Sequence, residues 1–132
     1  MSKKKILVID DEAPFTRLMK LNLEKSGSYE VMEINKGLEG LTAAREYKPD
    51  LILLDIIMPD IAGGDLAAQI RSDKELSNTP IVFLTAIVSK AEASKEAFAL
   101  GEFPLIAKPV DVEEVVELIE KHARARTKAQ RI

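Results

Sequence analysis

The sequence predicts a three-layer α/β sandwich built on a mainly parallel, five-stranded sheet. Short apolar runs alternate with longer segments of helical periodicity, and no internal repeat or low-complexity linker interrupts this alternation. Parallel strands need crossover connections, which are usually helical and right-handed. The chain has 132 residues, of which 46% are hydrophobic, so it can bury the core that one such domain requires.

Five apolar runs predict the strands. Each run is short, bounded and rich in β-branched residues or leucine, as is typical of strands buried on both faces. The runs cover residues 5–9, 29–34, 51–54, 81–84 and 105–107. Pro104 precedes the last run and lacks an amide hydrogen, which a strand start at a sheet edge tolerates. We therefore expect the last strand at an edge of the sheet.

Helical patterns fill the intervals between these runs. The first helix is expected to begin near Pro14 and to stop at Gly27. Its apolar residues are predicted to form one broad face, made of Phe15, Leu18, Met19, Leu21 and Leu23. The second helix is expected over residues 37–47. Its apolar residues at helical spacing are Leu38, Leu41 and Ala44.

Three further helices complete the alternation. The third starts near Gly64, and the fourth covers residues 89–100 and stops at Gly101. The fifth opens at Asp111, a good N-cap residue with Glu114 three positions later. The resulting sheet would have the flavodoxin-like strand order 2-1-3-4-5. In that order, ligands bind beyond the carboxyl ends of the strands, at the switch point between the first and third strands.

Composition and charge narrow the functional classes. Residues 121–132 hold five Lys or Arg and no acid, whereas residues 1–120 hold 14 basic against 22 acidic residues, a net charge of −8. A general nucleic-acid-binding domain would be more basic than this. The absence of cysteine excludes disulfides, thiolate metal sites and cysteine nucleophiles. No signal-type segment or membrane-length apolar stretch occurs, so we expect a cytoplasmic protein.

The charge division also predicts the domain organisation. We expect one domain over residues 1–123 and a basic C-terminal tail or linker remnant over residues 124–132. His122 lies beside this junction and is expected to be a surface residue at a helix end, remote from the acidic residues described next.

Acidic residues end two of the apolar runs. Asp10 and Asp11 follow the first run, and Asp55 follows the third. Each acid alone could be a helix cap or a turn residue. Because all three acids are expected at the same end of neighbouring strands, a shared binding site is the better interpretation. Carboxylates gathered there would repel one another unless something neutralises them, and a divalent metal with a phosphoryl group would do so.

A lysine and a threonine are expected at the same edge. Lys108 follows the fifth run, and its compact ammonium group is well suited to a phosphoryl or carboxylate oxygen. A cis peptide bond to Pro109 would aim this side chain inward. Thr85 ends the fourth run and supplies a hydroxyl group. The plainer alternatives are a surface lysine before a helix-initiating proline and an ordinary strand threonine.

These motifs, taken as a set, resemble the response-regulator receiver domains of two-component signalling. The similarity covers the whole domain, through residues 6–11, residues 53–59 with Gly63, residues 84–86 and the pair Lys108-Pro109. It implies that Asp55 accepts a phosphoryl group from a sensor histidine kinase or a histidine phosphotransfer protein. The modified domain would then act on a downstream partner or output domain, and it would catalyse its own phosphorylation and a slow dephosphorylation.

The resemblance also assigns the remaining roles. It implies that Mg²⁺ is bound directly by Asp11, largely through water by Asp10, and also by Asp55 and the backbone carbonyl of Ile57. It further implies that Thr85 and Lys108 contact phosphoryl oxygens. The family's usual contact surface would lie on the fourth helix, fifth strand and fifth helix.

Two departures from the family modify these expectations. The position three residues before Lys108 is usually aromatic and takes part in the activation switch, but here it is Leu105, with Phe103 two residues earlier. We therefore expect an altered switch. The positions that help to place the hydrolytic water are Ile57 and Ile87, whose side chains cannot bond to water. We therefore expect slow self-dephosphorylation.

Other functions remain open at this point. A receiver-like interaction module that acts without phosphorylation would have the same fold. A flavodoxin-type cofactor binder would instead want phosphate-cradling residues after the first strand, where Glu12 follows two aspartates. A phosphohydrolase of the haloacid-dehalogenase type would want a second acid at position 57. The chain is either a stand-alone regulator or a receiver excised from a longer protein.

Overall fold

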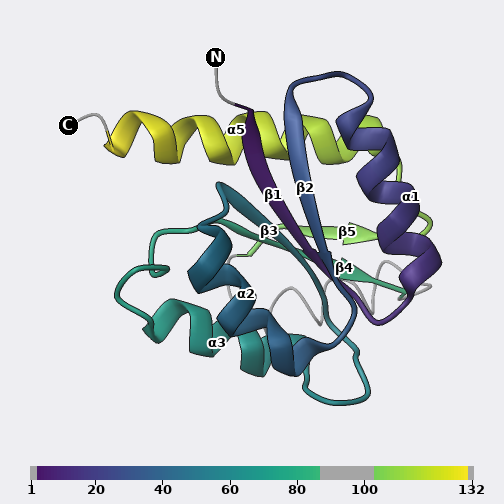
Figure 1. Ribbon diagram of the computed structural model, residues 1–132, viewed down its shortest axis with the longest axis vertical. Coiled ribbons are helices and arrows are strands. Elements are labelled where there is room, and N and C mark those ends of the chain that lie inside the picture. Colours follow the sequence, from purple (N-terminus) through teal and green to yellow (C-terminus); the bar gives the residue numbers. More distant parts are fainter. Residues whose placement is uncertain (1–2, 87–102, 131–132) are drawn as a thin grey trace.

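The computed structural model describes residues 3–86 and 103–130 and confirms the predicted α/β sandwich. A parallel sheet with the order β2-β1-β3-β4-β5 forms the central layer (Figure 1). The strands are β1 (Lys4–Ile9), β2 (Tyr29–Ile34), β3 (Leu51–Asp55), β4 (Ile81–Thr85) and β5 (Leu105–Ala107). As expected, β5 lies at an edge of the sheet.

Helices cover both faces of this sheet (Figure 1). One face carries α1 (Ala13–Glu24) and α5 (Val112–Gln130), and the other carries η1 (Gly37–Glu39), α2 (Gly40–Tyr47) and α3 (Gly63–Ser72). The helix expected over residues 89–100 lies outside the described residues. Helix α5 continues through most of the basic C-terminal segment. Within the described ranges, we find no helix with the length and apolarity needed to span a bilayer.

Each face of the sheet has its own hydrophobic core. Successive side chains of a strand point to opposite faces, so Ile6 and Val8 pack with α1 and α5, whereas Leu7 and Ile9 pack with α2 and α3. All four are fully buried. Because helices cover both faces, the central strands appear in the sequence as uninterrupted apolar runs.

The expected apolar face of α1 was too broad. Thr16, Met19 and Leu23 are buried on the sheet side of this helix, whereas Leu18 and Leu21 are 58% and 57% exposed. The buried residues follow one helical stripe, and the two leucines project from the other side. Leu38 is also exposed, because residues 37–39 form a 3₁₀ turn whose tighter winding differs from the α-helix expected there.

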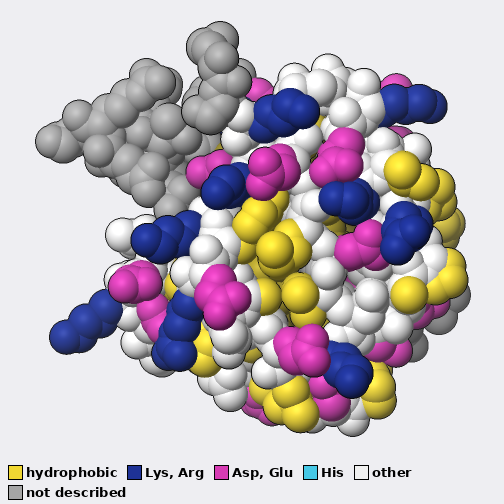
Figure 2. Space-filling view, in the orientation of Figure 1, with side chains coloured by type: hydrophobic (Ala, Val, Ile, Leu, Met, Phe, Trp, Pro, Cys, Tyr) yellow, Lys and Arg dark blue, Asp and Glu magenta, His cyan; other side chains and the backbone are white. Residues whose placement is uncertain are grey.

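Acidic and basic side chains are interspersed on the one face of the molecule that Figure 2 shows. On the face shown in Figure 2, Lys and Arg side chains alternate with Asp and Glu, with apolar groups between them. Among the described residues on this face, there is no continuous basic stripe of the kind typical of a nucleic-acid-binding face.

Helix α1 also protects the edge strand β2. Lys20 Nζ donates to the Val31 carbonyl at 2.7 Å, and the Val31 amide donates to Glu24 Oε2 at 3.0 Å. Lys20 and Glu24 pair with each other at 3.1 Å. Even-numbered residues of β2 bond to β1, so the peptide groups of Val31 face outward. The charged pair therefore satisfies polar groups that would otherwise offer a template for strand pairing.

We predict that Glu24→Ala lowers the free energy of unfolding by about 1–2 kcal/mol, because it leaves the Val31 amide without its acceptor. Urea denaturation measures this change. Glu46→Ala, at an exposed position of α2, is the matched control and should cost less than about 0.5 kcal/mol. Equal losses in the two variants would contradict the protective role of Glu24.

Candidate functional site

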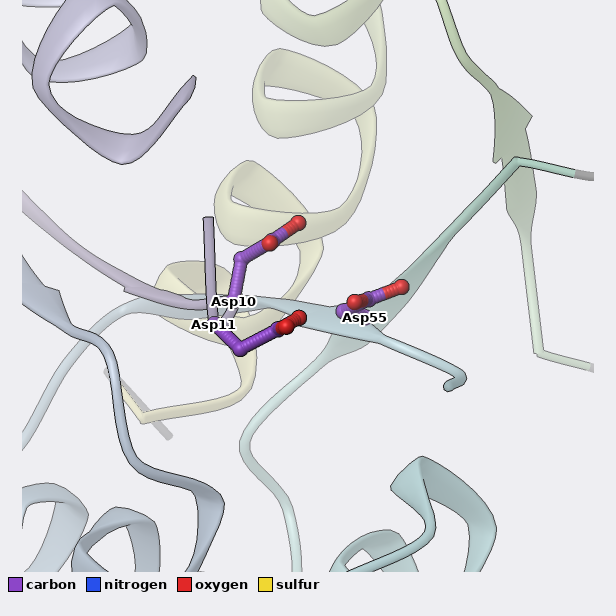
Figure 3. A group of neighbouring side chains, drawn as sticks. All are labelled: Asp10, Asp11 and Asp55. Carbon is purple, nitrogen blue, oxygen red and sulfur yellow. The ribbon is translucent and has the colours of Figure 1, made fainter. Parts of the chain in front are cut away.

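Three carboxylates meet at the carboxyl edge of the sheet (Figure 3). Strands β1 and β3 are neighbours, and Ile9 pairs with Leu54. The acids that come next, Asp10 and Asp55, are therefore adjacent, and Asp11 follows at the start of the β1–α1 loop. One oxygen from each carboxylate lies within 4.8 Å of the other two. The structure thus brings together all three acids that the sequence predicts at this edge.

Burial and mutual repulsion perturb this cluster. Asp10 is fully buried and Asp55 is 5% exposed. Loss of hydration, together with the negative charge of Asp10, raises the pKa of Asp55 to about 7, although Lys108 opposes the shift. Loss of hydration raises the pKa of Asp10 as well, against the influence of Lys108. Lys108 therefore compensates the negative charge of the Asp10 and Asp55 carboxylates only in part.

Lys108 is the cation of the site. Its Nζ lies 2.6 Å from Asp10 Oδ2 and 2.8 Å from Glu12 Oε1, and it stands 4.5 Å from the centre of the Phe15 ring. Burial alone would lower the pKa of Lys108, but the bonds to the two carboxylates outweigh it and the net shift is upward. The peptide bond to Pro109 is cis, as the sequence suggested. Lys108 thus reaches the acids as a charged donor.

Thr85 lies at the same edge as these groups. It ends β4 and is almost fully buried. Its carbonyl accepts a hydrogen bond from the Lys108 amide at 2.6 Å, so the ends of β4 and β5 are joined beside the site. Ile57 follows β3, with a 69% exposed side chain and an amide that lies 3.4 Å from Asp55 Oδ1.

The β3–α3 loop closes tightly over the backbone of β3. The Gly63 amide donates to the Ile56 carbonyl at 2.8 Å. A Cβ atom at Gly63 would overlap the Asp55 carbonyl oxygen and would lie 2.8 Å from Ile56 Cα. Only glycine permits this approach without a backbone shift. On the far side of the loop, Asp60 Oδ2 accepts a hydrogen bond from the Leu38 amide at 3.0 Å.

Two groups near the acids were missed by the sequence analysis as site residues. Glu12 is 2.8 Å from Lys108, and the Asn35 amide nitrogen donates to the Asp10 carbonyl at 2.9 Å. Glu12 directly follows the aspartate pair, and Asn35 directly follows β2 at the same sheet edge. Their position at strand ends was a signal that could have identified both.

The residues of the expected altered switch lie on one face of the sheet. Phe103 and Leu105 both pack into the core beneath α2 and α3, as alternation along a strand predicts. The Phe103 ring meets Phe83 edge to face, with centroids 5.3 Å apart. Ile87 lies outside the described residues. His122 lies within α5, which continues to Gln130, and its position is partly buried. The expectation of a histidine at a helix end was therefore wrong, and that of a surface position was only partly right.

The chemistry of the acidic cluster fits a hard divalent cation. Mg²⁺ favours a few carboxylate and carbonyl oxygens together with retained waters. Asp10 Oδ2 is buried, and Lys108 Nζ, 2.6 Å away, is its partner within the part of the chain that the structure describes. The raised pKa of Asp55 shows that the ionised form of the cluster lacks compensating charge, which a bound cation would supply.

Comparison with known proteins agrees with this geometry. The model of the response regulator receiver domain family matches residues 6–120. The chain is 32% identical over 119 residues to the polar-differentiation response regulator DivK of Brucella anthropi, covering 90% of this chain and 95% of DivK. It is 33% identical over 112 residues to the DNA-binding dual master transcriptional regulator RpaA of Synechocystis, covering 85% of this chain but only 46% of RpaA.

A solved structure shows the same fold. The CheY-like receiver domain protein of Methanospirillum hungatei superposes with a TM-score of 0.82 and 29% identity, covering 97% of this chain and 99% of that chain. The chain therefore belongs to the response regulator receiver domain family of two-component signal transduction.

Proposed function

We propose that this domain is a phosphorylation-controlled switch in which Asp55 accepts a phosphoryl group. The observation that carries the proposal is the convergence of Asp10, Asp11 and Asp55 within 4.8 Å, with Lys108 paired to one of them. A carboxylate can act directly as a nucleophile, and transfer of a phosphoryl group depends mainly on positioning and on charge stabilisation. Both requirements suit a rigid strand end that is lined with charge.

In the proposed reaction, an Asp55 carboxylate oxygen attacks the phosphorus of a phosphohistidine. The P–N bond breaks, its electron pair stays on the histidine nitrogen, and an acyl phosphate forms on Asp55. A bound Mg²⁺, held by the three aspartates and the Ile57 carbonyl, would neutralise charge on the phosphoryl oxygens. Thr85 would donate its hydroxyl hydrogen to one phosphoryl oxygen, and Lys108 would donate to another.

The proposal also includes the wider setting. The phosphodonor would be a sensor histidine kinase or a histidine phosphotransfer protein, and the modified domain would act on a downstream partner or output domain. We place the receiver domain over residues 1–123, the basic tail over residues 124–132, and the protein in the cytoplasm. The domain would catalyse its own phosphorylation, although its role is regulatory.

Incubation with acetyl phosphate tests the proposal. Intact mass measurement should show the gain of one phosphoryl group on the wild-type protein when Mg²⁺ is present and no gain when the ion is removed by chelation. No gain in either case, with the protein folded, would contradict the proposal. That result would favour a receiver-like interaction module that works without phosphorylation.

We predict that the affinity for Mg²⁺ rises between about pH 6 and about pH 8. The raised pKa of Asp55, about 7, means that this carboxyl holds a proton below neutrality and must lose it to bind a cation. Isothermal titration calorimetry at several pH values measures the change. The Asp55→Asn variant should bind more weakly and with a much flatter pH dependence. A wild-type affinity that does not change over this range would contradict the prediction.

We further predict that Ile57→Asn accelerates loss of the phosphoryl group by about tenfold. The side chain of Ile57 is exposed beside Asp55 and cannot hold a water molecule, whereas an amide can orient one for attack. Decay of the radiolabelled phosphoprotein measures the rate. Ile57→Val keeps an apolar side chain and should decay as slowly as the wild type; similar rates in all three proteins would exclude this role for position 57.

A further inference from the structure

Asn35 holds the peptide unit that joins two of the clustered acids. This residue follows β2, and its Nδ2 donates to the Asp10 carbonyl at 2.9 Å. That carbonyl belongs to the peptide between Asp10 and Asp11. One step earlier in the backbone, the Asp10 amide donates to the Ile34 carbonyl at 3.0 Å. Consecutive residues at the end of β2 therefore hold both peptide groups of Asp10.

A buried hydroxyl fixes the Asn35 side chain in turn. The second hydrogen of Nδ2 is directed to Thr16 Oγ1 at 2.9 Å, and Thr16 is fully buried in α1. The Thr16 hydroxyl faces Glu33 Oε1 at 2.9 Å, and Arg17 binds the other oxygen of Glu33 at 3.0 Å. Both hydrogens of the amide are thus used, and only one orientation of Asn35 satisfies both acceptors.

These bonds restrict the direction of the acidic side chains. A further bond, from the Glu12 amide to Asp10 Oδ1 at 2.9 Å, limits the Asp10 carboxylate itself. With the peptide plane held by Asn35, rotation that would swing Asp11 away from Asp55 is opposed. Carboxylates held in place before an ion arrives bind it more tightly, because less conformational freedom is lost on binding.

We infer that Asn35 is a positioning residue of the metal site, supported by Thr16. The inference rests on the proposed function, since it takes the Asp10, Asp11 and Asp55 cluster to be a Mg²⁺ site. Asn35 itself does not touch the ion or the phosphoryl group; it acts through the Asp10–Asp11 peptide. Changes to groups that orient metal ligands usually weaken metal binding by tenfold or more. We expect a loss of about tenfold for Asn35→Ala.

Two measurements test the inference. Calorimetric titration with Mg²⁺ gives the affinity, and amide hydrogen exchange of the metal-free protein gives the protection of Asp11 and Glu12. Asn35→Ala should lose affinity and should exchange faster at these two amides. Asn78→Ala, an exposed asparagine in the α3–β4 connection at the opposite edge of the sheet, is the matched control and should change neither.

A second pair of variants covers the case in which Asn35→Ala does not fold. Thr16→Val removes the hydroxyl that holds Asn35 and should weaken Mg²⁺ binding by about threefold, whereas Thr16→Ser keeps the hydroxyl and should bind as the wild type does. Wild-type affinity and exchange in Asn35→Ala, or equal affinities in the two Thr16 variants, would overturn the inference. Failure of the wild-type protein to bind Mg²⁺ would instead overturn the proposed function.

Discussion

The Asp55→Asn protein should gain no phosphoryl group under conditions that phosphorylate the wild type. An amide has nearly the shape of the carboxylate it replaces but lacks the negative oxygen that attacks phosphorus. The comparison is made by intact mass after incubation with acetyl phosphate and Mg²⁺. Asp65→Asn, an exposed aspartate in the first turn of α3, is the matched control and should be modified as fully as the wild type.

Loss of modification in Asp55→Asn would not be explained by unfolding. The pKa of Asp55 in the folded state, about 7, is raised above its ordinary value of 3.8. The stability that a protonated Asp55 contributes is therefore lost as the pH rises from about 4 to about 7. Without metal at about pH 8, we expect Asp55→Asn to be more stable than the wild type, by about 2 kcal/mol after allowance for relaxation. Thermal unfolding of the wild type and of Asp55→Asn, measured from about pH 4 to about pH 8, gives this difference in stability. Phosphorylation of Asp55→Asn would rule out Asp55 as the sole acceptor.

Gly63→Ala should disrupt the site by displacing the backbone of Asp55. The added Cβ would overlap the Asp55 carbonyl oxygen, and backbone atoms cannot rotate away as the end of a side chain can. We expect a loss of about 3 kcal/mol in the free energy of unfolding, at the upper end of typical overpacking costs. Phosphorylation from acetyl phosphate should slow by at least about tenfold, since small misplacements of reacting groups are costly.

Gly40→Ala provides the comparison for this effect. Its Cβ would meet Leu66 Cδ2 at 2.8 Å and Ile9 Cδ1 at 3.0 Å, which are the mobile ends of side chains. The gain in helix propensity, about 1 kcal/mol, offsets part of the strain within α2. Urea denaturation and phosphorylation rates should therefore separate the two variants clearly. Equal effects at Gly40 and Gly63 would show that the close approach at Asp55 is not the cause.

The fold could be predicted because its central strands are covered on both faces. Strands β1, β3 and β4 appear in the sequence as short apolar runs, and helices of ordinary length separate them. Parallel pairing then places the residues after each strand at one edge. For this reason the sequence alone predicts Asp10, Asp55 and Lys108 at a common edge.

Side-chain contacts within the site could not be predicted in the same way. The pairing of Lys108 with Glu12 as well as Asp10 depends on how two loops approach each other in space. Likewise, the bond from Asn35 to the Asp10 carbonyl depends on the orientation of one amide between two strand ends. The apolar face of α1 was overestimated for a related reason. The periodicity of α1 alone did not show that Leu18 and Leu21 would lie on the side of the helix that faces away from the sheet.

A structure determined with Mg²⁺ and beryllofluoride tests the central claim most directly. We predict a metal ion bound by oxygens of Asp10, Asp11 and Asp55, with the fluoride group joined to Asp55 and contacted by Lys108 and Thr85. An acidic pocket that stays empty at saturating ion, or a fluoride group attached elsewhere, would contradict the assignment of Asp55 as a metal-assisted phosphoryl acceptor.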